Sequence, residues 1–184
     1  MALISLSELE SRLGRSLTAA ESSSFTLLNT ALQAMVEKQI GSSLEAVEPS
    51  TRYYDGGTQH IAIDPCTDIT SISYASDDYV ADPAWEDDDF TAEPINKTLK
   101  TMIRTRYGKS YKAMNNIAVT AKFSIAGDVN TQNIVKSAML EALVSEMGNT
   151  DNVKSESIEG YSVEYLSEQT KDSLAVIKFL FPSI

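Results

Sequence analysis

Residues 129–147 read VNTQNIVKSAMLEALVSEM, and the fold predicted for this chain is organised around them. Asn130 and Thr131 are residue types that cap helix N-termini, and Gly148 is the type that most often ends a helix. The polar side chains form one narrow stripe at helical spacing, at 133, 137, 141 and 145. A helix on the surface of a lone globule usually has a wider polar face. We therefore predict a helix that is covered on more than one side, either as a central core helix or at a subunit interface.

The charge of the chain limits its partners. Its 184 residues include 26 acidic and 15 basic side chains, which gives a formal net charge of −11 at pH 7. Such a surface repels phosphate backbones, so we expect no tight binding to nucleic acid. No apolar run is long enough to span a bilayer, and no basic segment precedes an apolar one at the N-terminus. We therefore expect neither a membrane partner nor secretion.

Few side chains are suited to catalysis or to metal binding. Cys66 is the single cysteine and His60 the single histidine, which excludes an intrachain disulfide and leaves no ligand set for zinc. The run 77–93 offers paired carboxylates, but its prolines predict a loop without the fixed separation that sugar hydrolysis needs. The same run lacks the ligand pattern of an EF-hand, which leaves calcium as a minor alternative. We expect no enzymatic activity and no cofactor.

Two short motifs predict capped helices at the N-terminal end. Ser5 with Glu8, and Thr18 with Glu21, have the spacing of a capping box. Each motif is followed by apolar residues at helical spacing and then by a glycine: Leu6, Leu9 and Leu13 before Gly14, and Phe25, Leu28, Leu32, Met35, Val36 and Ile40 before Gly41. We predict one short helix and one longer helix.

The segment 51–126 is predicted to be a β-rich insertion. Strands are expected at 51–54, 61–63, 69–74, 98–104 and 117–125, and Asp64 and Pro65 mark a break between the second and the third. The last strand alternates regularly from Ile117 to Ile125, and we expect it to pair with 98–104 through a turn at 107–110. The acidic run 77–93 contains no basic residue, and we expect an exposed loop pinned to the body by Trp85 and Phe90.

A basic segment follows the acidic loop. Residues 97–112 contain no acid and these cations: Lys97, Lys100, Arg104, Arg106, Lys109 and Lys112. In an assembly, Arg104 and Arg106 of one subunit could meet Asp87, Asp88 and Asp89 of the next. The alternative is that the two segments neutralise each other within one subunit.

The last part of the chain, 149–184, is predicted to contain a polar linker, a strand and a short helix. The linker covers 149–157, the strand follows the alternation at 161–165, and the helix runs over 172–181. The chain ends in the apolar residues Phe179, Phe181 and Ile184. An apolar end needs a partner, so these residues either close the protein's own core or anchor it on another protein, as a helix laid in a groove does.

Several of these segments resemble the head–tail connector, or adaptor, proteins of tailed phages. The resemblance lies in the order of four short stretches: MALISLSEL at 1–9, LTAAE at 17–21, YYDG at 53–56 and ESIEGYSVEY at 156–165. In the last stretch the family pattern has no residue at the position of Glu159. The β-rich insertion is also larger than in the compact members of the family.

The resemblance implies a structural protein of the virion neck. Such adaptors form a closed ring of about a dozen copies beneath the portal protein. They join the portal to the tail or to a stopper, and DNA passes through the ring without specific binding. In this chain the implied subunit interface includes Leu140 and Val144 of the apolar helix and the charged residues named above, and the implied portal anchor is the apolar C-terminal end.

The sequence thus predicts an α+β fold in a single domain over 1–184. A small helical bundle is expected to contain the antiparallel β insertion 51–126 and to end in a short C-terminal helix within 149–184. Two other functions stay open. One is an acidic protein-binding module outside a virion, and the other is a hydrolase that uses the carboxylates of the acidic loop.

Overall fold

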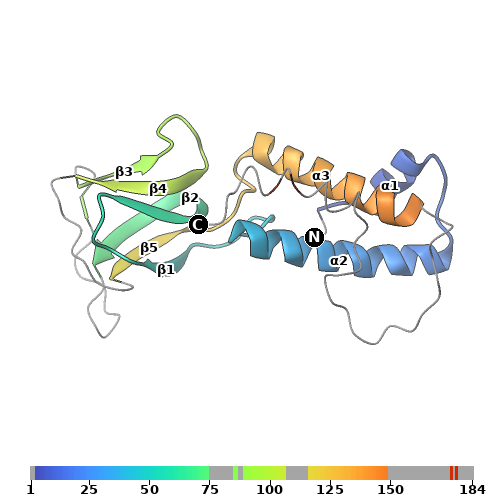
Figure 1. Cartoon of the computed structure of the whole chain (residues 1–184), viewed down its shortest axis with the longest axis horizontal. Coiled ribbons are helices and arrows are strands. Elements are labelled where there is room, and N and C mark those ends of the chain that lie inside the picture. The colour runs from blue at the N-terminus through green and yellow to red at the C-terminus, as the bar shows by residue number, and fades with distance from the viewer. Residues whose placement is uncertain are drawn as a thin grey trace. The chain divides into compact units, whose positions relative to one another are not determined.

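The computed structural model describes residues 3–74, 85–86, 89–106, 116–148, 175 and 177. Within these residues the fold is α+β, with three helices and one antiparallel five-stranded sheet (Figure 1). The elements in chain order are α1 (Leu6–Leu13), α2 (Ala19–Ile40), β1 (Ser50–Tyr54), β2 (His60–Tyr74), β3 (Phe90–Glu93), β4 (Lys100–Thr105), β5 (Ile117–Lys122) and α3 (Val129–Gly148). Ala175 and Ile177 are also helical, inside the C-terminal helix predicted at 172–181.

The chain, predicted as a single domain, divides into two compact units. Of the described residues, 3–39, 130–148, 175 and 177 belong to the helical unit, and those within Ile40–Val129 belong to the β unit. The sheet therefore belongs to a segment inserted between two helices, and this inserted unit is wider than the predicted range 51–126.

Both predicted capping boxes are confirmed in the helical unit. The Glu8 backbone N–H donates to Ser5 Oγ at 3.3 Å, and the Ser5 N–H donates to Glu8 Oε2 at 2.8 Å. The same reciprocal bonds join Thr18 and Glu21 at 3.3 and 2.8 Å. Both predicted helix ends are confirmed as well, because the glycines that follow α1 and α2, at 14 and 41, have φ of +70° and +77°.

The central helix predicted at 129–147 is confirmed as α3, but the capping residues differ from the prediction. The helix begins at Val129, so Asn130 and Thr131 lie in its first turn and Asp128 directly precedes it. The described part of α3 reaches Gly148, whose φ is not left-handed, so the predicted left-handed cap at this glycine is wrong. The buried residues of α3 are Val135, Ala138, Met139, Ala142 and Leu143.

The sheet has the strand order β1-β5-β2-β4-β3, and the predicted pairing of the fourth strand with the fifth is wrong. The long strand β2 lies between them: Ile61 pairs with Ile103 of β4, and Ile72 pairs with Val119 of β5. The predicted break at Asp64 and Pro65 is also wrong. The strand continues through these residues with a shift of register between Ala62 and Cys66, and irregular positions of this kind tolerate proline.

The β unit has a core of its own. Its buried cluster consists of Ile61, Ile63, Cys66, Ile72, Trp85, Ile103, Ile117, Val119, Ala121 and Phe123. The alternation predicted for the last strand is confirmed, because the members at 117, 119, 121 and 123 come from that apolar face. Trp85 is 9% exposed and its ring lies 5.1 Å from that of Tyr74, so the tryptophan expected to pin the acidic loop does pack on the sheet.

Candidate interaction surfaces

The basic segment of the β unit contacts its own neighbouring strand. Arg104 on β4 forms an ion pair with Glu93 on β3, with 3.1 Å between Nε and Oε1. The guanidinium of Arg106 donates to Thr91 Oγ1 at 3.2 and 3.3 Å. Lys100 Nζ donates to the backbone carbonyls at 94 and 95, at 2.8 and 3.2 Å. These cations thus have partners within the chain, and Arg104 keeps a side chain that is 42% exposed.

The predicted charged interface is only partly described by the structure. Asp89 lies beside the basic strand, because the backbone N–H of Arg106 donates to its carbonyl at 2.7 Å. Asp87 and Asp88 lie outside the described residues. The carboxylate that pairs with Arg104 is Glu93, which the sequence did not single out. The sequence alone could not identify Glu93 as the partner of Arg104, because the pairing depends on β3 lying next to β4 in the sheet.

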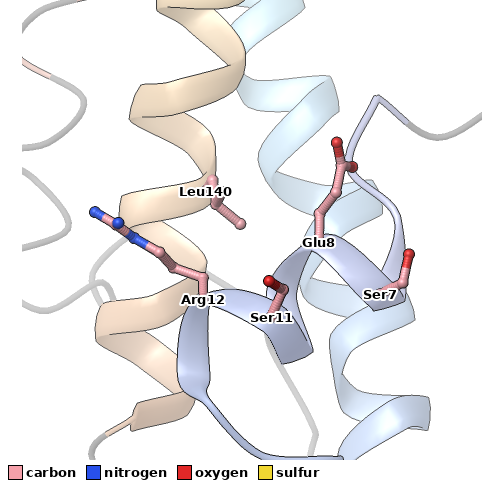
Figure 2. A pocket seen from close by; sticks show the side chains of 5 residues that line it. All are labelled: Ser7, Glu8, Ser11, Arg12 and Leu140. Carbon is pink, nitrogen blue, oxygen red and sulfur yellow. The ribbon is translucent and has the colours of Figure 1, made fainter.

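An open hollow in the helical unit lies between α1 and α3. It has a volume of about 430 Å³ and is lined by Ser7, Glu8, Ser11, Arg12 and Leu140 (Figure 2). Figure 2 shows Leu140 on α3 facing the α1 side chains. This places one predicted interface residue at a concave surface. Val144, one turn further along α3, is half-buried.

Two ion pairs join α1 to α3 around this hollow. Glu8 Oε1 lies 2.5 Å from Lys136 Nζ, and Arg12 pairs with Glu141. The Lys136 ammonium and the Ser5 backbone N–H together lower the pKa of Glu8 to about 2. Each charge beside the hollow is therefore matched by one of opposite sign.

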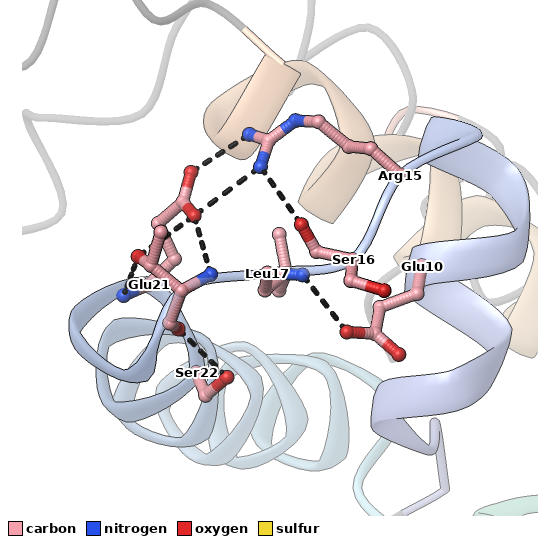
Figure 3. Close-up of polar contacts among 7 residues, drawn as sticks. Glu10, Arg15, Ser16, Leu17, Glu21 and Ser22 are labelled. Carbon is pink, nitrogen blue, oxygen red and sulfur yellow. Dashed lines mark hydrogen bonds and ion pairs between the residues drawn. The ribbon is translucent and has the colours of Figure 1, made fainter.

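A polar network fixes the turn between α1 and α2 (Figure 3). Arg15 contacts both carboxylate oxygens of Glu21, at 2.7 and 3.2 Å, and the Leu17 N–H donates to Glu10 Oε1 at 2.8 Å. The Arg15 guanidinium, followed by the backbone N–H of Thr18, lowers the pKa of Glu21 to about 2. The network satisfies backbone donors in the turn and at the start of α2.

The β unit contains a second polar network that the sequence did not predict. Arg52 donates to the Gly41 carbonyl and to Asp64 Oδ2, at 2.5 and 2.6 Å, and the Tyr54 hydroxyl donates to the same carboxylate oxygen at 2.9 Å. Arg52 also lies 4.2 Å above the ring of Phe123. Burial and the Asp64 carboxylate raise the pKa of Tyr54 well above its ordinary value, so the hydroxyl keeps its proton.

The one cysteine and the one histidine of the chain both lie in the β unit. Burial, followed by the nearby Asp64 carboxylate, raises the pKa of the Cys66 thiol to about 12, which leaves it protonated and unreactive at neutral pH. His60 is exposed at the start of β2. Among the residues with described positions, no group of three or more His, Cys, Asp or Glu side chains is placed to hold a metal ion. No helix in that part of the chain is long and apolar enough to cross a membrane.

The predicted portal anchor, Phe179, Phe181 and Ile184, lies outside the described residues. Ile177, just before it, is helical and only 2% exposed. No protein-family model matches the chain, and a search of curated proteins finds no significant match.

Proposed function

We propose that this chain is a structural virion protein, a head–tail connector adaptor that forms a closed ring of about a dozen copies between the portal and the tail or a stopper. The observation that carries the proposal is the order of the elements. Two capped helices, a β unit and a mainly apolar helix follow one another as they do in the connector family that the sequence resembles. In the proposal the helices form a small bundle that contains the β insertion.

The proposed contacts use three parts of the chain. Copies meet through Leu140 and Val144 of α3, and through Arg104 and Arg106 against the aspartates at 87–89 of the next copy. The apolar C-terminal end binds the portal. The net charge of −11 favours a channel that does not hold DNA, because a lumen rich in lysine and arginine would retain the phosphates. The adaptor has no catalytic activity and no cofactor in this proposal.

Reconstitution on a portal tests the proposed ring. The purified protein is mixed with the portal of the phage that encodes it, and the complex is examined by native mass spectrometry and negative-stain electron microscopy. We expect a closed ring on the portal, and a monomer in isolation, because contacts that form only on a template are weak in solution. A single bound copy, or none, contradicts the proposal and favours an acidic protein-binding module.

A charge-reversed variant tests the same ring at its proposed interface. Arg104→Glu with Arg106→Glu should prevent ring formation and leave the monomer folded, and assembly of the unmodified protein should weaken as salt rises. The control is Lys38→Glu with Lys122→Glu, which changes the net charge equally. Lys38 is exposed, and Lys122 pairs with Asp68 on the surface of the sheet. If the charge-reversed variant forms rings as well as the control does, Arg104 and Arg106 make contacts only within their own subunit.

A further inference from the structure

The outer face of α2 is uncharged over four turns. This outer face consists of Ala20, Ser23, Leu27, Thr30, Ala31 and Ala34, all exposed. It lies opposite Phe25, Leu32 and Val36, which are buried. A solvated helix face normally has charged side chains. Here no charged residue occurs between Glu21 and Glu37, in a chain with 41 charged side chains among 184.

The polar atoms of this face already have partners within the helix. Ser23 Oγ donates to the Ala19 carbonyl at 3.1 Å, and Thr30 Oγ1 donates to the Thr26 carbonyl at 2.8 Å. Another surface can therefore cover the face without leaving a donor unsatisfied. Leu27 is the one large side chain that projects from it, and it is 59% exposed.

The hollow between α1 and α3 could accept the outer face of α2, because it offers an apolar contact, space and balanced charge. Leu140 supplies an apolar contact, the small side chains of Ser7 and Ser11 leave space, and the two ion pairs leave no unbalanced charge among the four ionised groups. Two copies that each have a net charge of −11 repel one another over most of their surface. The outer face of α2 and this hollow are surfaces at which two copies can approach without that repulsion.

We propose that the Leu27 side of α2 in one copy docks into the α1–α3 hollow of a second copy. The two surfaces are different, so the contact is heterologous: the first copy keeps its hollow unused, and the second copy keeps its outer face of α2 unused. Repetition of such a contact forms a ring when the rotation between neighbouring copies closes, and for this closure the inference rests on the proposed function.

Cysteine cross-linking between two variants tests this contact directly. Leu27→Cys and Ser11→Cys are prepared separately, mixed, and oxidised both in concentrated solution and on the portal. Leu27 and Ser11 are both exposed, so a cysteine at either position is accessible. The natural Cys66 is buried, so the unmodified protein should form no disulfide. We expect a disulfide between the two variants and none when either is oxidised alone. Leu27→Cys mixed with Thr51→Cys, an exposed site in the β unit, is the matched control.

The outcomes separate the inference from the proposed function. A ring on the portal without the 27–11 disulfide overturns the docking and leaves the adaptor proposal intact. The disulfide in solution without a ring on the portal supports the docking and overturns the adaptor. Preferred 27–27 links overturn the heterologous contact. As a second measurement, Leu27→Glu should weaken the association of copies on the portal about tenfold or more, because it places a charge in an apolar contact. The stability of the Leu27→Glu monomer should not change, since Leu27 is exposed.

Discussion

At the scale of single residues, two aspartates of β2 form ion pairs of different kinds. Asp64 accepts from Arg52 and Tyr54 in a half-buried network, whereas Asp68 pairs with Lys122 at 2.9 Å with its side chain 64% exposed. We expect Asp64→Asn to lower the free energy of unfolding by about 1–2 kcal/mol, because Arg52 loses its carboxylate partner. Asp68→Asn should change it by less than about 0.5 kcal/mol.

Urea denaturation followed by tryptophan fluorescence measures both effects. Trp85 is the only tryptophan and lies in the core of the β unit, so its signal reports on that unit. Equal losses in the two variants would show that the Asp64 network adds nothing beyond a surface pair.

The capping boxes and the Asp64 network show which contacts of single residues could be predicted from the sequence. Capping boxes were found because both partners lie three residues apart and the motif is local. The Arg52–Asp64 pair depends on how β1 and β2 lie in the sheet, and the sequence gives no sign of that arrangement. Gly41 belongs to the same network, since a Cβ there would lie 2.5 Å from Asp64 Oδ1. The sequence showed this glycine only as a helix stop.

At the scale of elements, the Glu8–Lys136 pair makes the contact between α1 and α3 dependent on pH. The pKa of Glu8 is lowered from 4.5 to about 2 in the folded protein. A depressed carboxyl pKa contributes stability that is fully present above the unfolded value and is lost as pH falls toward the folded value. The loss should therefore occur between about pH 4.5 and pH 2. The Glu8 side chain is 40% exposed, so screening limits the contribution to about 1 kcal/mol or less.

A double-mutant cycle measures this contribution. Glu8→Gln, Lys136→Met and the double variant are unfolded in urea and followed by far-UV circular dichroism, at neutral pH and at about pH 3. We expect a coupling energy at neutral pH that shrinks in acid. Glutamine keeps the shape of the capping box, so the cycle isolates the ion pair. A coupling that is the same at both pH values would exclude ionisation of Glu8 as its source.

The elements also show where local sequence patterns stop being sufficient. The ends of α1 and α2 were predicted because caps and glycines act on adjacent residues. The strand partners were mispredicted because the hairpin preference for sequence neighbours gave way to the fifteen-residue strand β2, which pairs with β4 over its first half and with β5 over its second. In the sequence, Pro65 is the visible trace of this change of partner, whereas the register shifts within β2 appear only in the structure.

At the scale of the whole molecule, the open question is whether the apolar C-terminal end belongs to this protein or to a partner. Ile177 is helical and 2% exposed, so this residue itself is packed within the protein, directly before the predicted anchor. Truncation after Lys178 keeps Ile177 and removes Phe179, Phe181 and Ile184. We expect the truncated protein to stay folded and to lose binding to the portal.

Circular dichroism, urea denaturation and pull-down on the purified portal give the three readouts for this truncation. The matched variant is Phe179→Ser with Ile184→Ser in the full-length chain, which removes apolar surface but keeps the backbone. A folded truncated protein that no longer docks, together with weakened docking of the serine variant, supports a portal anchor, because the apolar contact of a helix in a groove is then lost without any loss of core. An unfolded or aggregated truncated protein would mean that these residues complete the protein's own core, where each large apolar side chain contributes about 1.5–3 kcal/mol.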